Sequence, residues 1–211
     1  MMDAEKRDFD SEAATWDEEP TRVRLANDVA EAILGQITLT PDMDVLDFGC
    51  GTGLVTLRLQ PSVRSITGVD SSQGMIDVLK AKISKLQLPN VKAIKIDPDK
   101  GDFPVGAYHL VLSSMTLHHV KKIEPLLQHL YGLIVPTGYI SIADLDPEDG
   151  RFHDNNKGIF HFGFDRGELR RTLTESGFSD IRDTTASEVV KPQPEGEMKR
   201  FTIFLMTGRR M

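Results

Sequence analysis

Three glycines at alternate positions, directly after a short hydrophobic segment, constrain this chain more than any other feature. Residues 44–48 are predicted to form a buried strand, and residues 54–59 are predicted to begin a helix. Gly49, Gly51 and Gly53 lie between them. Glycine is needed where the backbone turns sharply or approaches a ligand closely, and the turn presents free N–H groups at a helix N-terminus. We therefore predict a ligand cradle at the carboxyl end of this strand.

The rest of the chain alternates strand-like and helix-like segments, which is typical of a parallel α/β sheet covered by helices. Hydrophobic periodicity and turn residues predict further helices over 22–36, 71–86, 122–133 and 165–176. Further strands are predicted over 64–69, 91–96, 108–112, 139–143, 180–189 and 200–206. Pro192, Pro194 and Gly196 separate the last two strands, so we expect an antiparallel hairpin there.

Length and charge indicate a single soluble domain, residues 1–211, with two additions. The chain carries a net charge of −7. Residues 1–20 hold eight acidic and two basic side chains, so this arm carries −6 and the remainder only −1. Residues 144–164 form a long connection without periodicity, which we interpret as a substrate lid. The acidic balance argues against a nucleic-acid partner.

The single cysteine and the hydropathy pattern bear on the cellular compartment. Cys50 has no partner for an internal disulfide, which favours a reducing, cytoplasmic setting. No apolar run approaches the ~20 residues of a membrane span. The sequence does not indicate an oligomeric state.

Two kinds of cofactor compete for the glycine turn. A dinucleotide fingerprint has the spacing G-x-G-x-x-G beside a pyrophosphate, whereas here the third glycine, Gly53, comes one position early. Asp47 precedes the first glycine by two positions and would be unfavourable beside a pyrophosphate. A carboxylate there suits a ligand that carries an ammonium group.

Two further acidic residues follow the next two strands. Asp70 lies at the end of the second predicted strand, where a carboxylate can accept both hydroxyls of a ribose. That feature is common to NAD and S-adenosylmethionine sites. Asp97, followed by Pro98, ends the third strand and would reach an adenine amino group; Asp99 and Asp102 are its rivals for that contact.

Taken together, residues 47–53, 69–70, 97 and 108–120 resemble the class I S-adenosylmethionine-dependent methyltransferases. The likeness covers roughly residues 44–143 and is nearest to the small-molecule group called methyltransferase type 11. It implies a Rossmann-like α/β fold, with a seven-stranded, mostly parallel sheet in the order 3-2-1-4-5-7-6 and the seventh strand antiparallel. It also implies S-adenosylmethionine as methyl donor and S-adenosylhomocysteine as product.

The resemblance also suggests which residues contact the cofactor. Trp16 on the arm and Arg22 just after it either lie near the carboxylate of the cofactor or anchor the arm. Met75 either contacts the adenine or belongs to the helix core. The cofactor residues implied are Asp47, Gly49, Cys50, Gly51, Gly53, Asp70, Ser71, Met75, Asp97, Pro98 and Ser113, together with Trp16 and Arg22.

Candidate catalytic groups follow the fourth and fifth strands. His118 and His119 lie where a transferred methyl would point, and Asp144 ends the fifth strand. Adjacent side chains point apart on regular structure, so we expect at most one histidine in the pocket. His153 in the lid is a further candidate base. No recognised metal-ligand spacing is present, so no metal is expected.

The leading functional hypothesis is methyl transfer to a small molecule by in-line displacement. Residues 113–116 lack the motif of enzymes that methylate exocyclic amines of bases. The alternatives are a non-catalytic S-adenosylmethionine-binding domain, an NAD-dependent oxidoreductase of similar fold, and an RNA or protein methyltransferase.

Overall fold

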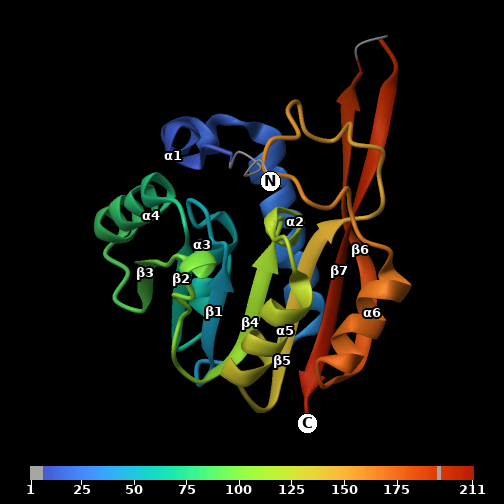
Figure 1. Ribbon diagram of the computed structural model, residues 1–211. Helices are drawn as coiled ribbons and strands as arrows, with labels where there is room; N and C mark the ends of the chain where they lie inside the picture. The colour runs from blue at the N-terminus through green and yellow to red at the C-terminus, as the bar shows by residue number, and fades with distance from the viewer. Residues whose placement is uncertain (1–6, 194–195) are drawn as a thin grey trace.

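The computed structural model describes residues 7–193 and 196–211 and leaves out the Asp99 side chain. Seven strands form one sheet in the order β3-β2-β1-β4-β5-β7-β6, which confirms the predicted topology (Figure 1). The sheet is parallel except that β7 runs antiparallel to both β5 and β6. The strands are β1 (Asp44–Phe48), β2 (Ser65–Asp70), β3 (Val91–Lys95), β4 (Tyr108–Ser114), β5 (Ile134–Leu145), β6 (Phe178–Pro192) and β7 (Met198–Arg210).

Helices cover both faces of this sheet, with α2 behind it and α5 and α6 in front of it in Figure 1. The helices are α1 (Phe9–Glu12), α2 (Pro20–Gln36), α3 (Leu54–Leu59), α4 (Gln73–Leu86), α5 (Ile123–Leu133) and α6 (Arg166–Glu175). Short 3-10 turns are η1 (Ala13–Glu18), η2 (Gln60–Ser62), η3 (Pro98–Lys100) and η4 (Leu117–His119).

Alternating side chains of the central strands build two separate cores. Val45 of β1 packs with α2 and α3, whereas its neighbour Leu46 packs with α5 and α6. In β4, Leu110 and Leu112 join the first core and Val111 joins the second. This period of two is what a sheet with both faces covered requires.

Local sequence signals fix the beginnings of two helices. Ser72 caps α4, with its side chain accepting a hydrogen bond from the Met75 N–H at 3.1 Å. Asp165 caps α6 in the same way at the Glu168 N–H, 2.9 Å away. Such caps satisfy N–H groups that the first helical turn leaves unpaired.

The structure corrects the start of the fifth strand. The sequence predicts that this strand begins at Tyr139, because Pro136 and Gly138 are typical of a turn, but β5 already begins at Ile134 and pairs there with Tyr108. The register shifts between Tyr108 and Leu110, and Thr137 adopts a positive φ of 66°. Residues 136–138 therefore form an irregularity within a strand.

The acidic arm and the lid lie at the same end of the sheet, where the parallel strands finish (Figure 1). The arm is helical from residue 9 to residue 18, as α1 and η1; its first six residues lie outside the described part of the chain. Within the described residues, no helix is long and apolar enough to cross a membrane.

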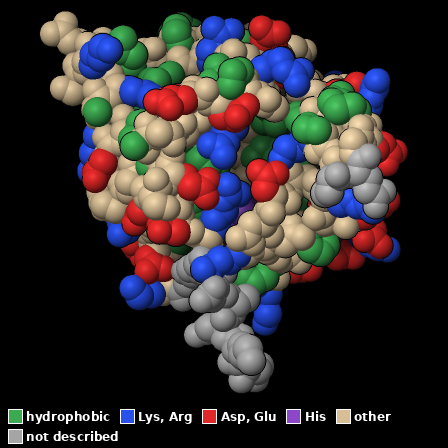
Figure 2. Space-filling model, turned by 90° about the horizontal axis from the view of Figure 1, so that it is seen from above, with side chains coloured by type: hydrophobic (Ala, Val, Ile, Leu, Met, Phe, Trp, Pro, Cys, Tyr) green, Lys and Arg blue, Asp and Glu red, His purple; other side chains and the backbone are tan. Residues whose placement is uncertain are grey.

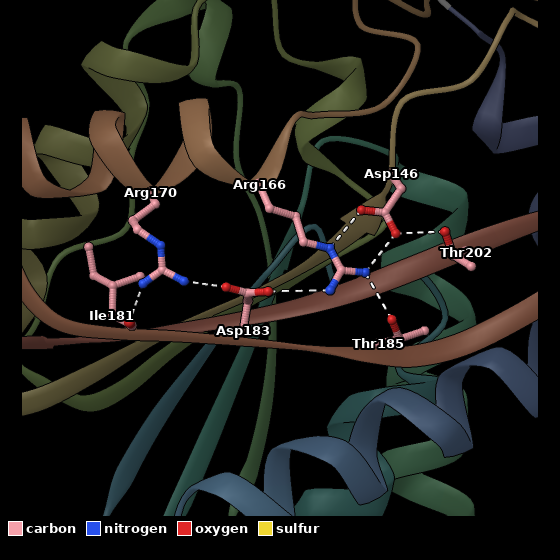
Figure 3. A network of polar contacts seen from close by, with 7 residues as sticks. All are labelled: Asp146, Arg166, Arg170, Ile181, Asp183, Thr185 and Thr202. Atoms are coloured by element: carbon pink, nitrogen blue, oxygen red, sulfur yellow. Dashed lines mark hydrogen bonds and ion pairs between the residues drawn. The ribbon is translucent and has the colours of Figure 1, made fainter.

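Because β5 extends to Leu145, the lid comprises residues 146–164 rather than 144–164, and a network of charged side chains anchors its base (Figure 3). Arg166, the first residue of α6, donates two hydrogen bonds of 2.7 Å to Asp146, where the lid begins. Arg166 also contacts Asp183 at 3.3 Å, and Thr202 of β7 donates to Asp146 at 2.6 Å. Both ends of the lid are thereby held against the β6–β7 hairpin.

Replacing Arg166 with alanine is expected to lower the free energy of unfolding by about 1–3 kcal/mol, the scale of lost charged hydrogen bonds at a partly buried site. Arg171→Ala is a matched control, because Arg171 is exposed and its ion pair with Glu168 is long, at 4.0 Å. Urea denaturation of both variants measures the difference. Equal losses in the two variants would show that the network does not stabilise the fold.

Candidate active site

The glycine turn is a tight bend with one open side. The φ values of Gly49, Gly51 and Gly53 are +76°, +54° and +85°. Residues other than glycine rarely adopt this backbone conformation. A Cβ on Gly49 would lie 2.2 Å from Thr116 Oγ1, so protein packing explains that glycine. Apart from its chain neighbours, a Cβ on Gly51 would meet no atom of the described residues within 4 Å, so this side of the bend is open toward a ligand.

Asp70 closes the bend from the end of β2. Its carboxylate accepts hydrogen bonds from the Gly51 N–H at 2.8 Å and from the Ser72 N–H at 2.9 Å. Burial raises the pKa of Asp70 above its ordinary value, although these N–H donors act in the opposite direction. Each carboxylate oxygen keeps a further lone pair, which is what two ribose hydroxyls would need.

Asp47 lies beneath the bend and is almost wholly buried. Thr56 of α3 donates a 2.5 Å hydrogen bond to its carboxyl group. Burial, reinforced by the nearby charge of Asp70, raises the pKa of Asp47 to about 7. Burial and the same two acids raise the pKa of the Cys50 thiol, which keeps it protonated. Asp47 is therefore shielded from solvent and influences the bend electrostatically.

The acidic arm is fastened over the start of α4. Asp10 accepts hydrogen bonds from Ser72 Oγ at 2.5 Å and from the Gly74 N–H at 2.9 Å. Asp17 accepts one from Thr52 Oγ1 at 2.5 Å and also pairs with Lys82. The arm therefore contacts both the glycine bend and the helix that follows Asp70.

Aromatic residues of the arm extend this cover toward the histidines. The Arg22 guanidinium lies 3.8 Å from the centre of the Trp16 ring, and Phe9 meets Trp16 edge to face at 5.9 Å. Phe9 also meets the ring of His119 edge to face at 5.0 Å. One arm thus joins the bend to the ends of β4 and β5.

The remaining predicted cofactor residues occupy varied environments. Asp97 pairs with Lys100 at 2.9 Å, and its own N–H lies 3.3 Å from Asp102, so these rivals share one short turn. Pro98 begins η3 in that turn, and Ser71 is exposed. Met75 is 2% exposed, which agrees with helix core.

Ser113 lies on β4, beside the bend in the sheet order, and is buried. Its Oγ has no hydrogen-bond partner among the described residues.

His118 and Asp144 form a buried pair beyond the bend. His118 Nδ1 lies 2.7 Å from Asp144 Oδ1, and both side chains are at most 1% exposed. Burial alone would raise the pKa of Asp144, but His118 and backbone N–H donors hold that pKa below its ordinary value. An ionised Asp144 can only accept a proton carried on His118 Nδ1, and the neutral tautomer with that proton has no proton on Nε2.

His119 and the lid residue His153 surround this pair. Ring centres lie 4.2 Å apart for His118–His119 and 4.9 Å apart for His118–His153. The expectation that adjacent histidines point apart is wrong here, because η4 is a single 3-10 turn rather than regular structure. Burial and neighbouring positive charges lower the pKa of His119 to about 4 and that of His153 to about 3, so both are neutral at pH 7.

The lid covers the histidines through backbone contacts. The Phe160 N–H donates to the His118 carbonyl at 2.9 Å, and His119 Nδ1 lies 2.8 Å from the Gly158 carbonyl. Phe152 and Phe164 are buried in the two cores, so half of the lid's four phenylalanines serve packing. From this end of the molecule, histidine appears only as a small area between Lys and Arg side chains (Figure 2).

Two surface hollows lie away from the bend. One, of about 370 Å³, runs between the base of the lid and β7 and is lined by Asp146, Pro147, Glu148, Asp149, Lys199, Arg200, Phe201 and Thr202. The other, of about 130 Å³, lies at the opposite end of β5 and β7 beside Tyr139. Within the described residues, no group of three His, Cys, Asp or Glu side chains is arranged to hold a metal ion.

Comparison with known proteins relates the chain to methyltransferases. Residues 45–138 match the family described as "Methyltransferase domain". An uncharacterized methyltransferase of Schizosaccharomyces pombe is 36% identical over 135 residues, which cover 57% of this chain and 48% of the relative. The chain thus spans about half the length of that relative.

Solved structures show the same fold. A Haloferax volcanii protein in complex with the Trm112 methyltransferase activator superposes with a TM-score of 0.76 and 17% identity, covering 96% of this chain and 98% of its own. Phosphoethanolamine N-methyltransferase 2 of Haemonchus contortus, in complex with S-adenosyl-L-methionine, superposes with a TM-score of 0.69 and 14% identity. The superposition covers 96% of this chain and 60% of that protein. The chain therefore has the fold of these methyltransferases, and its residues 45–138 match the methyltransferase-domain family.

The raised pKa of Asp47 predicts a distinctive pH dependence of stability. The folded protein keeps a proton near pH 7 that the unfolded chain, with a pKa of 3.8, has already released. Stability from this group is therefore greatest at acidic pH and falls as the pH rises toward 7.

Asp47→Asn removes this effect. The difference in unfolding free energy between the wild type and Asp47→Asn should fall by about 3 kcal/mol between pH 4.5 and 8, at about 1.4 kcal/mol per pKa unit. Urea denaturation at both pH values measures it. A difference that is the same at both would mean that Asp47 titrates normally.

Proposed function

We propose that this chain binds S-adenosylmethionine at the glycine bend and transfers its methyl group to a small molecule beside His118. The observation that carries the proposal is the set of carboxylates around the open side of Gly51. Asp47 lies below the bend, Asp70 closes it, and Asp10 of the arm is near enough to act on the pKa of Asp70.

The charge of this cradle favours S-adenosylmethionine over a dinucleotide. Burial raises the pKa of Asp47 and of Asp70, and the charge of Asp70 adds to the first shift and that of Asp10 to the second, which indicates a locally negative potential. S-adenosylmethionine carries a positive sulfonium and an ammonium group, whereas NAD would bring two negative phosphates to the bend. Coulomb energy in a partly buried site is large enough to decide between them.

Within this cradle, the chain's residues have distinct roles. Asp70 holds the ribose hydroxyls, and the open face of Gly51 lets the backbone approach the ligand. Asp97 and Pro98 border the adenine, the Ser113 carbonyl faces the ammonium group, and the arm closes over them. When bound, S-adenosylmethionine supplies an electrophilic methyl group and leaves as S-adenosylhomocysteine.

Burial supports a small acceptor rather than a macromolecule. His118 is 1% exposed beneath the lid, so only a small group inserted under that cover can reach its Nε2. Outside the arm, the sequence carries a charge of only −1, which gives no basic footprint for RNA. Most of the catalysis would come from holding acceptor and methyl in line at contact distance.

Asp70→Ala is expected to weaken binding of S-adenosylhomocysteine about 5- to 150-fold, the loss of ~1–3 kcal/mol from hydrogen bonds to a charged group. Asp77→Ala, on the exposed side of α4, is the control and should bind normally. Isothermal titration calorimetry measures both, and circular dichroism checks folding. Unchanged affinity in a folded Asp70→Ala protein would rule out the ribose contact.

Trp16→Ala tests the arm as a cover for the cofactor. Without the stacked ring, Arg22 and Phe9 lose a common partner, and S-adenosylhomocysteine should bind about 3- to 10-fold more weakly. Phe162→Ala removes an exposed lid aromatic and serves as the control. If calorimetry gives the same dissociation constant for Trp16→Ala and the wild type, the arm does not contribute to binding.

A further inference from the structure

Two imidazole nitrogens beneath the lid lack hydrogen-bond partners. Among the described residues, His118 Nε2 and His153 Nε2 are both buried and unpaired. Buried polar atoms are almost always hydrogen-bonded, so two such nitrogens on rings 4.9 Å apart need an explanation. A ligand group placed between them would satisfy both.

The two nitrogens come from different parts of the fold and adjoin the cofactor bend. His118 belongs to η4, whereas His153 belongs to the lid. Thr116, directly before η4, donates a 3.3 Å hydrogen bond to the Gly49 carbonyl, so η4 is tied to the glycine bend. A group held between the histidines therefore lies next to the proposed methyl donor.

We propose that His118 Nε2 and His153 Nε2 form an acceptor subsite for a phenol-type hydroxyl group, which would make the reaction an O-methylation. This inference rests on the proposed function, since it names the acceptor class for the same site.

A hydroxyl group can form a hydrogen bond with each of the two nitrogens. In the neutral tautomer that pairs Nδ1–H with Asp144, His118 Nε2 carries no proton and can accept the hydroxyl hydrogen. His153 is neutral and can carry its proton on Nε2, from which it donates to a hydroxyl lone pair. One donor and one free acceptor are what a hydroxyl offers.

The chemical step balances with these groups alone. The acceptor oxygen bonds to the methyl carbon, whose bond to sulfur breaks and leaves its electron pair on sulfur. The hydroxyl proton passes to His118 Nε2, and the ionised Asp144 stabilises the imidazolium that results.

The surrounding charge argues against an ammonium acceptor. The positive charges of Arg7 and Lys191 reach the cluster, since both lower the pKa of His153. Asp144 is the carboxylate beside His118, and its oxygens already accept from the His118 ring and from backbone N–H groups. An ammonium ion has no lone pair for His153 and would add a further positive charge. The rings of His119 and Phe152 give the subsite an aromatic lining.

The first test is the tautomer of His118, read from 15N NMR of histidine-labelled protein at pH 7. We expect an unprotonated Nε2 in the wild type and a protonated Nε2 in Asp144→Asn, whose amide can donate to Nδ1. A protonated His118 Nε2 in the wild type would overturn the inference.

The second test is titration of the S-adenosylhomocysteine-bound protein with phenol. Saturable shifts are expected at Nε2 of His118 and His153, and none on adding ethylammonium. His129 is the internal control, because its Nε2 is also buried without a partner but its ring packs on Phe103. Absence of shifts at the two histidines, or equal shifts at His129, would overturn the inference.

His153→Phe keeps the ring and removes the nitrogen. It should weaken phenol binding about fivefold or more, the loss of one hydrogen bond, while affinity for S-adenosylhomocysteine stays within about twofold. Equal phenol affinity in this variant contradicts the subsite. Calorimetry keeps the two proposals apart: failure of the wild type to bind S-adenosylhomocysteine refutes the proposed function, whereas normal binding with no phenol effect refutes only the acceptor class.

Discussion

The hydrogen bond from the Gly51 N–H to the Asp70 carboxylate, 2.8 Å long, connects the two halves of the cofactor site. It joins the bend after β1 to the end of β2, and parallel pairing of these strands brings both ends to one edge of the sheet. Because φ at Gly51 is positive, the N–H points toward β2 while the other side of the residue stays open. The geometry of the bend thus gives both the internal contact and the ligand face.

A second pairing repeats this principle further along the sheet. β4 and β5 are parallel neighbours, so the segments after them also meet at that edge. His118 follows β4 and Asp144 lies near the end of β5, and burial makes their interaction strong enough to keep Asp144 ionised. Cofactor cradle and histidine cluster are therefore neighbours because their strands are neighbours.

Much of this arrangement is predictable from sequence, and the exceptions have physical reasons. The strand positions and the bend follow from periodicity and glycine spacing, which act locally, whereas the strand order is what the resemblance to methyltransferases implies. The relation of His118 to His119 is not predictable, since it depends on a short 3-10 turn, and two N–H groups of the lid donate to the His118 carbonyl in that turn. The contact of His153 with His118 joins residues 35 positions apart, and no periodicity in the lid signals it. The start of β5 was missed because Pro136 and Gly138 normally mark turns.

The arm's attachment also determines how ligands would be exchanged. Asp10 and Asp17 fasten α1 and η1 to Ser72, Gly74 and Thr52, all of which adjoin the cradle. In the proposed reaction, spent cofactor leaves past these contacts, so each cycle requires them to break and reform. Departure of product would then be timed by detachment of this ten-residue helical segment rather than by bond making.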